Sequence, residues 1–112
     1  MSAAFLPISV SLKDRKCLVV GGGVVALRKI ETLIEHGADI TVISPEFEPQ
    51  IAFFGSKDTI KLENRPYKSP EAATFGLVIA ATDDNELNTQ VAEDARGAGV
   101  LVNVVDKPAQ CD

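Results

Sequence analysis

Three consecutive glycines separate an apolar run from an amphipathic run near the start of the chain. The apolar run "KCLVVG" (16–21) has the length and composition of a buried strand, and it ends in the first glycine. From Val24 to His36 apolar side chains recur at helical spacing with charged side chains between them, and Gly37 follows as a C-terminal cap. This order of strand, glycine turn and helix predicts the opening of a parallel α/β fold.

Strand-like and helix-like segments alternate along the rest of the chain. Buried strands are expected at 38–44, 77–82 and 100–105, a half-exposed strand at 59–65, and a short flanking strand within 5–12. Parallel neighbours need crossover connections, and these are right-handed. The pattern therefore predicts one domain over residues 1–112, a Rossmann-like, doubly wound parallel sheet with strand order 3-2-1-4-5.

The helices of the second half are less clearly marked. A helix is expected from Asp84 to Ala98, with Asp83 and Glu86 as a capping box at its start. A shorter helix broken by Pro49 is expected within 46–55, and 66–76 reads as a loop with at most one helical turn.

Composition and charge narrow the class of protein. Aromatic residues make up 5% of the 112 residues and there is no Trp, so the core must be aliphatic, which suits parallel strands. The net charge of −5 argues against nucleic acid or an anionic membrane as a partner. No run has the length of a membrane-spanning helix and no signal peptide is visible, so a cytoplasmic location is expected. Cys17 and Cys111 lack metal-site spacing; neither a metal site nor a disulfide is expected.

The glycine turn itself matches a dinucleotide-binding fingerprint, G-x-G-x-x-G/A, over residues 21–26. Gly21 permits the tight turn out of the strand, and Gly23 leaves room for a pyrophosphate to approach the backbone. Ala26 is small enough for the helix to lie close to the sheet. A glycine turn that only reverses the chain is the alternative. The strand before it, the helix after it and the next strand favour dinucleotide binding at the helix N-terminus.

The end of the second strand departs from the usual fingerprint. An acidic residue commonly binds the ribose hydroxyls there, whereas this chain has Ser44, Pro45 and Glu46. Ser44, a backbone group, or Glu46 two residues later could take that role. No Arg follows closely to hold a 2′-phosphate, so NAD is favoured over NADP as the cofactor.

Polar residues also follow the last two predicted strands. Ligands of open α/β sheets bind beyond the carboxyl ends of the strands, where Thr82, Asp83 and Asp106 are expected. For Asp83 and Asp84 the alternative role is capping of the helix that follows. For Asp106 the alternative is a turn residue ahead of Pro108.

Three stretches together resemble a known family. "LPISVSLKDRKCLVVGGGVVALRKIETLIEHGADITVISP", "VIAATDDNELN" and "VNVVDKPAQCD" are similar to the N-terminal domain of siroheme synthases, which are precorrin-2 dehydrogenases and, in part, sirohydrochlorin ferrochelatases. The resemblance runs from about Leu6 to the last residue. It implies NAD-dependent oxidation of precorrin-2 to sirohydrochlorin and, in some members, insertion of ferrous iron.

The resemblance also implies roles for particular residues. The glycine loop and the segment after the second strand would hold NAD, with Thr82 and Asp83 near its nicotinamide half. Asp106 would be the catalytic general base, or would guide a metal or accept pyrrole protons. The cofactor-binding residues so predicted are Gly21, Gly22, Gly23, Val24, Val25, Ser44, Pro45, Glu46, Thr82 and Asp83.

Family members continue beyond the point where this chain stops, into a dimerisation segment and a helical domain. The resemblance therefore predicts an NAD-binding domain that is a piece of a longer, homodimeric enzyme. One alternative is a nucleotide-sensing regulatory domain of the potassium-transport type. Such domains usually keep the acidic residue after the second strand, so Ser44 and the "NVVDKP" element (103–108) argue against it. Another alternative is a Rossmann-like domain that serves only assembly.

Overall fold

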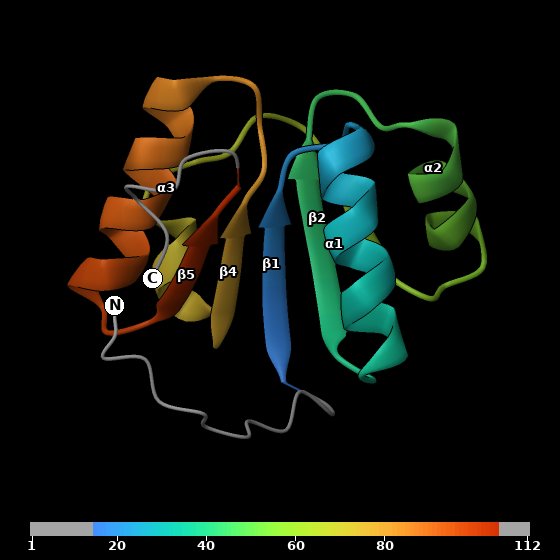
Figure 1. The fold of residues 1–112 in the computed structure, drawn as a ribbon, viewed down its shortest axis with the longest axis horizontal. Helices are drawn as coiled ribbons and strands as arrows, with labels where there is room; N and C mark the ends of the chain where they lie inside the picture. Colours follow the sequence, from blue (N-terminus) through green and yellow to red (C-terminus); the bar gives the residue numbers. More distant parts are fainter. Residues whose placement is uncertain (1–14, 106–112) are drawn as a thin grey trace.

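A computed structural model describes residues 15–105 as a five-stranded parallel sheet with helices on both faces (Figure 1). The sheet order is β3-β2-β1-β4-β5, which confirms the predicted order and the α/β class. The elements are β1 (Lys16–Val20), α1 (Val24–Glu35), β2 (Asp39–Ser44), α2 (Pro49–Ser56), β3 (Lys61–Asn64), the 3₁₀ helix η1 (Glu71–Thr74), β4 (Leu77–Ala80), α3 (Asn85–Gly97) and β5 (Leu101–Val104).

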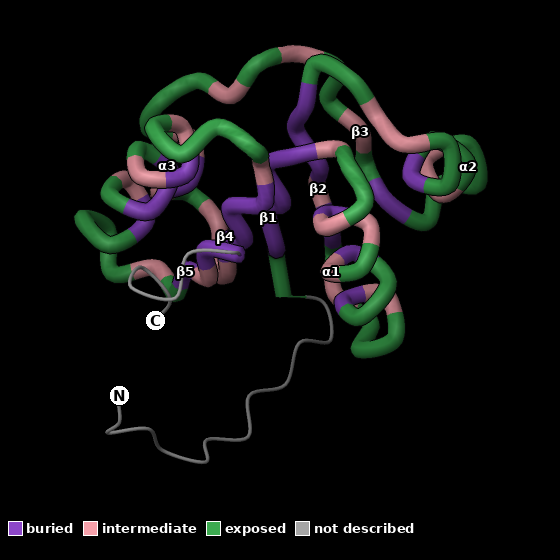
Figure 2. Tube along the Cα trace, turned by 45° about the horizontal axis from the view of Figure 1, so that its top comes forward, coloured by how far each residue is buried: buried purple, intermediate pink, exposed green. Residues whose placement is uncertain are grey.

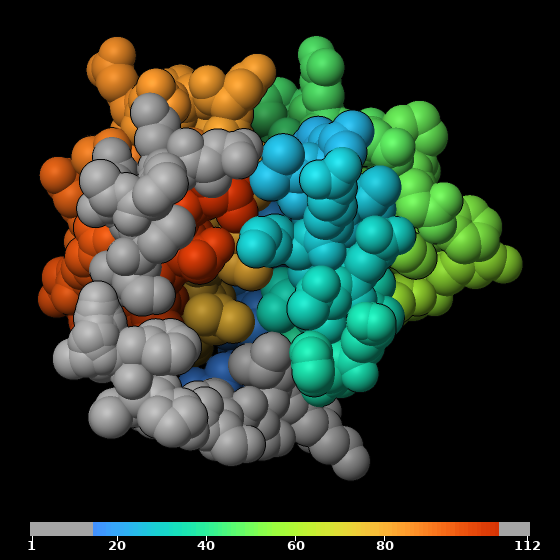
Figure 3. Space-filling model, viewed as in Figure 1, coloured from blue at the N-terminus to red at the C-terminus, as the bar shows by residue number. Residues whose placement is uncertain are grey.

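The central strand β1 contributes to two cores, one on each face of the sheet. Cys17 and Val19 pack with Ala26 of α1, whereas Leu18 packs with Val91 of α3 on the other face. All five side chains are fully buried, and Figure 2 shows buried residues along β1 and β4. The side chains of α1 lie in front of the β1–β2 side of the sheet (Figure 3). Burial on both faces explains why β1 reads as an unbroken apolar run.

Two predictions about helix starts are wrong. Pro49 does not break a helix but begins α2, because a proline at the first helical position loses no intrahelical hydrogen bond. The Glu48 carboxylate caps α2, accepting from the Gln50 N–H at 2.5 Å. The cap of α3 is Asp84, not Asp83: the Asp84 carboxylate accepts from the N–H groups of residues 86 and 87 at 3.0 and 3.2 Å.

The remaining predictions concern the two cysteines, the N-terminal segment and membrane crossing. Cys17 is buried, as expected, and burial raises the pKa of its thiol. Cys111 and the flanking strand expected within 5–12 lie outside residues 15–105. Within that range, no helix combines the length and apolar character that a membrane crossing requires.

A bidentate ion pair fixes the crossover between β3 and β4. The Arg65 guanidinium donates to both carboxylate oxygens of Glu71, at 2.9 and 2.5 Å, and the Lys68 N–H donates to the same carboxylate at 2.6 Å. The hydrogen bonds from Arg65, more than any other contact, lower the pKa of Glu71 below its ordinary value. The charged carboxylate is therefore a stabilising group of the folded state.

This lowered pKa predicts part of the acid sensitivity of the fold. The stabilisation from Glu71 is present above its pKa in the unfolded chain, about 4.3, and is lost as the pH falls through its lower folded-state pKa. We expect the free energy of unfolding, measured with urea, to fall less between pH 7 and pH 3 in Glu71→Gln than in the wild type. Glu93→Gln removes an exposed carboxylate from α3 and is the control. An acid-induced loss of stability equal in Glu71→Gln and the wild type would contradict this.

Candidate functional site

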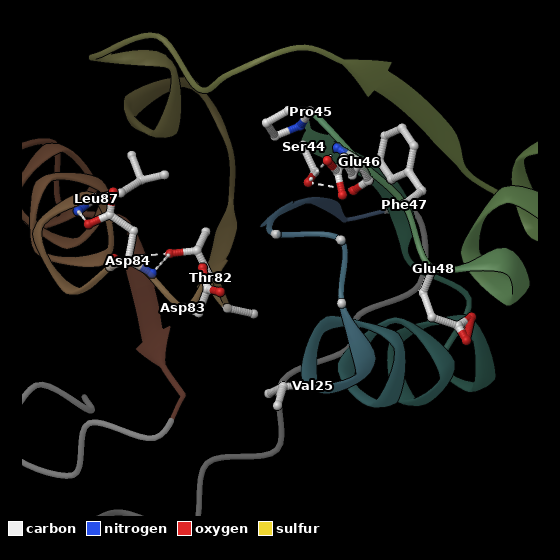
Figure 4. A pocket seen from close by; sticks show the side chains of 14 residues that line it. Val25, Ser44, Pro45, Glu46, Phe47, Glu48, Thr82, Asp83, Asp84 and Leu87 are labelled. Atoms are coloured by element: carbon white, nitrogen blue, oxygen red, sulfur yellow. Dashed lines mark hydrogen bonds between the residues drawn. The ribbon is translucent and has the colours of Figure 1, made fainter.

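A cleft of about 650 Å³ opens where β1, β2 and β4 end (Figure 4). Its lining residues are Gly21, Gly22, Gly23, Val25, Ser44, Pro45, Glu46, Phe47, Glu48, Ala81, Thr82, Asp83, Asp84 and Leu87. The cleft thus brings together the predicted cofactor-binding residues with one exception. Val24 is not among the lining residues; it begins α1 and is 56% exposed. Asp106 lies outside the residues that the structure describes.

Gly21 makes the turn out of β1. Its φ of +134° is rare for residues with a side chain, and a Cβ here would overlap the backbone carbonyl of Ala81. Its N–H donates to the Ile43 carbonyl at 3.0 Å, which ties the glycine loop to β2. The position therefore has the turn-forming role that the fingerprint predicts.

Gly22 has a packing role that the fingerprint does not reveal. A Cβ at Gly22 would overlap the backbone carbonyl of Glu46 and would lie 2.8 Å from the Ser44 Oγ. The Gly22 carbonyl also accepts from the Glu48 N–H at 2.7 Å. The glycine loop and the loop after β2 therefore pack backbone against backbone. One feature of the sequence indicated this packing: Gly22 is a glycine at a position where the fingerprint accepts any residue.

Gly23 leaves the N-terminus of α1 open. A Cβ built on Gly23 would meet no atom within 4 Å, and no side chain caps α1, whereas carboxylates cap α2 and α3. The first hydrogen bond of α1 runs from the Leu27 N–H to the Gly23 carbonyl at 2.9 Å. Within residues 15–105, the N–H groups at 24–26 have no partner. These N–H groups and the helix dipole make this end of the cleft suited to a bound anion.

Ser44 and Glu46, at the end of β2, have different roles. Ser44 is 8% exposed, and its hydroxyl donates to the Glu46 carbonyl at 2.6 Å and accepts from the Glu46 N–H at 3.3 Å. Since the single hydroxyl proton is engaged in this turn, Ser44 has no donor left for a ligand. The Glu46 carboxylate is exposed and has no partner within the described part of the chain. Of the two, Glu46 carries the free acceptor in the cleft.

The loop after β4 is held by a buried amide that sequence reasoning did not single out. Asn88 is 1% exposed, and its carboxamide makes three hydrogen bonds to Thr82. Asp83 is exposed and lines the cleft between Thr82 and the helix cap Asp84. One signal could have found Asn88: its position falls on the apolar face that α3 presents to the sheet through Val91 and neighbouring residues.

Among residues 15–105, no three His, Cys, Asp or Glu side chains lie together in a way that could hold a metal ion. The cleft presents the main-chain N–H groups at the start of α1 and the carboxylates of Glu46 and Asp83, which lie on opposite sides of it (Figure 4).

Comparisons with known proteins agree with this geometry. The family model described as "Putative NAD(P)-binding" matches residues 8–112. The siroheme synthase of Methylococcus capsulatus is 44% identical over 108 residues, which are 96% of this chain and 23% of the relative. The siroheme synthase of Thioalkalivibrio sulfidiphilus is 45% identical over 107 residues, 96% of this chain and 22% of the relative. The chain thus spans less than a quarter of the length of these relatives.

A solved structure has the same fold. The protein titled "SirC, precorrin-2 dehydrogenase" superposes with a TM-score of 0.78 and 25% sequence identity. The match covers 92% of this chain and 50% of that chain.

Proposed function

This chain belongs to the NAD(P)-binding family whose model spans residues 8–112, and from that premise we propose that it is the NAD-binding domain of an enzyme that oxidises precorrin-2 to sirohydrochlorin. The observation that carries the proposal is the uncapped N-terminus of α1, which opens into the cleft beside Gly23. Relatives named siroheme synthase and a structural neighbour named precorrin-2 dehydrogenase supply the reaction.

The residues present fit a dinucleotide. The N–H groups at the start of α1 would hold the diphosphate, which lies at the helix N-terminus in folds of this kind. Glu46, with its free carboxylate, would accept hydrogen bonds from ribose hydroxyls and would repel a 2′-phosphate. Thr82 and Asp83 would then face the nicotinamide half. This arrangement favours NAD over NADP.

The chemistry divides between the cofactor and the protein. Bound NAD supplies an acceptor for the hydride that leaves precorrin-2. The oxidation also releases one proton, and we assign its removal to the carboxylate of Asp106, two residues after β5 ends. Assembly as a homodimer and ferrous iron as a second substrate stay predictions from the family resemblance.

Calorimetric titration and an absorbance assay test the proposal. We expect this chain to bind NAD more tightly than NADP, and a longer version of it to form sirohydrochlorin from precorrin-2 with NAD. In that longer version, Asp106→Asn should leave NAD affinity unchanged and lower kcat by about 100-fold, as loss of a general base does. No heat with either coenzyme on folded protein would overturn the proposal, and unchanged turnover would remove Asp106 from it.

A further inference from the structure

We propose that Asn88 is a positioning residue, which fixes the Thr82–Asp83 segment in place for the nicotinamide half of the dinucleotide. The inference rests on the proposed function, and it goes beyond it by assigning a task to a side chain that does not line the cleft. Asn88 lies in the first turn of α3, directly behind the loop that follows β4.

Burial of an amide side chain has a cost in free energy. Asn88 is 1% exposed, and a buried carboxamide destabilises a fold unless its polar atoms are hydrogen-bonded. Its Oδ1 accepts from the Thr82 N–H at 3.1 Å and from the Thr82 hydroxyl at 2.7 Å. Its Nδ2 donates to the Thr82 carbonyl at 2.9 Å. A single side chain therefore satisfies both main-chain polar groups and the hydroxyl of one loop residue.

These bonds continue the pairing of β4 beyond the end of the sheet. Among the described residues, the last bond between β4 and the chain at the end of β5 runs from the Val105 N–H to the Ala80 carbonyl at 3.1 Å. Two residues later Thr82 pairs with no strand of residues 15–105, and the Asn88 carboxamide offers it one donor and one acceptor, as a peptide group would. The direction of the chain after β4 is thus fixed by a side chain of α3.

These bonds also restrict Asp83, the residue that follows Thr82 and lines the cleft. Asp84 is held by its own cap bonds and by the bond from its N–H to the Thr82 hydroxyl at 3.1 Å. Asp83 sits between these two anchored residues and lines the cleft, on the opposite wall from Ser44 and Glu46 (Figure 4). The glycine loop lies between the walls. A dinucleotide whose diphosphate binds there and whose adenosine ribose meets Glu46 places its other half against Thr82 and Asp83.

The test compares two ligands on one variant. ADP keeps the adenosine and the diphosphate of NAD but lacks the nicotinamide riboside, so it does not need the Thr82–Asp83 segment. In calorimetric titrations we expect Asn88→Ala to raise the Kd for NAD about tenfold, and the Kd for ADP less than about twofold, because the loop must be ordered when NAD binds. Binding is measured at a temperature where circular dichroism shows each protein folded.

A matched control separates positioning from stability. Val91→Ala removes a fully buried side chain from the same helix, one turn further on, and makes no contact with Thr82 through hydrogen bonds. We expect it to lower the Tm without changing the ratio of the two Kd values. Asn88→Asp, which keeps the acceptor and loses the donor to the Thr82 carbonyl, is the second variant and should also raise the ratio.

The titrations distinguish failure of the positioning role from failure of the proposed function. A ratio of Kd values that stays at the wild-type value in the Asn88 variants, or that Val91→Ala changes equally, would overturn the positioning role. Failure of both Asn88 variants to fold would show a structural role and would overturn it too. If the folded wild type binds neither NAD nor ADP, it is the proposed function that fails.

Discussion

Gly23→Asp is expected to stabilise the fold and to abolish dinucleotide binding. Gly23 is the N-cap of α1, with extended φ and ψ of −97° and −164° that any residue adopts, and a Cβ there meets no atom within 4 Å. An aspartate at this position can accept hydrogen bonds from the free N–H groups of the first turn. Its charge also interacts favourably with the helix dipole, so we expect a gain of about 1 kcal/mol in the free energy of unfolding.

The same carboxylate competes with the ligand. The N–H groups that it satisfies are those that would hold the diphosphate, and its negative charge repels the phosphates at short range. We therefore expect the affinity for NAD to fall by at least about 100-fold, an effect of the size that charged hydrogen bonds have. Urea unfolding and calorimetric titration measure the two effects on the same protein.

A control separates the position from the added charge. Gly97→Asp introduces the same residue at the end of α3, where a Cβ also meets nothing within 4 Å. It should leave NAD affinity unchanged, and it should not stabilise the fold, because a carboxylate at a helix C-terminus opposes the dipole. NAD binding that survives in Gly23→Asp would show that the ligand does not use the N-terminus of α1.

Gly22→Ala is expected to have the opposite effect on stability, although it changes the adjacent residue. The new methyl group would overlap the Glu46 carbonyl, and neither that carbonyl nor the backbone at residue 22 can move easily. The Ser44 hydroxyl holds that carbonyl at 2.6 Å, and the Glu48 N–H holds the Gly22 carbonyl at 2.7 Å. Relief requires the loop after β2 to move, so we expect a loss of about 3 kcal/mol in the free energy of unfolding.

Thermal and urea unfolding would measure this loss as a Tm lower by roughly 10 °C or more. Gly97→Ala is the control, since it adds the same methyl group to a helix with open space around it. That variant should be slightly more stable than the wild type, because alanine has the higher helix propensity. Equal stability of Gly22→Ala and Gly97→Ala would contradict the backbone packing between the two loops.

The type and order of the secondary-structure elements could be predicted from the sequence because they depend on local patterns. The apolar runs of β1 and β4 and the helical spacing of α1 each lie within one segment, and burial follows directly from them. The α1 helix begins at Val24, as the pattern predicts, and ends at Glu35, one residue before its predicted end at His36. The glycine fingerprint was likewise sufficient to predict the turn at Gly21 and the open helix N-terminus beside Gly23.

Hydrogen-bond partners could not be predicted in this way. Asp83 and Asp84 are both acceptable caps in sequence, and the backbone angles at the start of α3 decide that Asp84 is the cap. A serine at the end of β2 suits a ribose hydroxyl equally well, until the structure shows its proton donated to Glu46. Each choice depends on which group the fold brings within hydrogen-bond distance.

Apolar periodicity and glycine positions act within short segments, so they were enough to predict the strands, the helices and the place of the cleft. The strand order followed from the dinucleotide-binding fold that these patterns indicate. The folded chain was needed to see that Gly22 packs against Glu46, that Glu46 carries the free acceptor and that Asn88 holds Thr82. These contacts arise because parallel strands far apart in the chain end at the same edge of the sheet. Their loops meet there, and contacts between those loops depend on distances that no local pattern encodes.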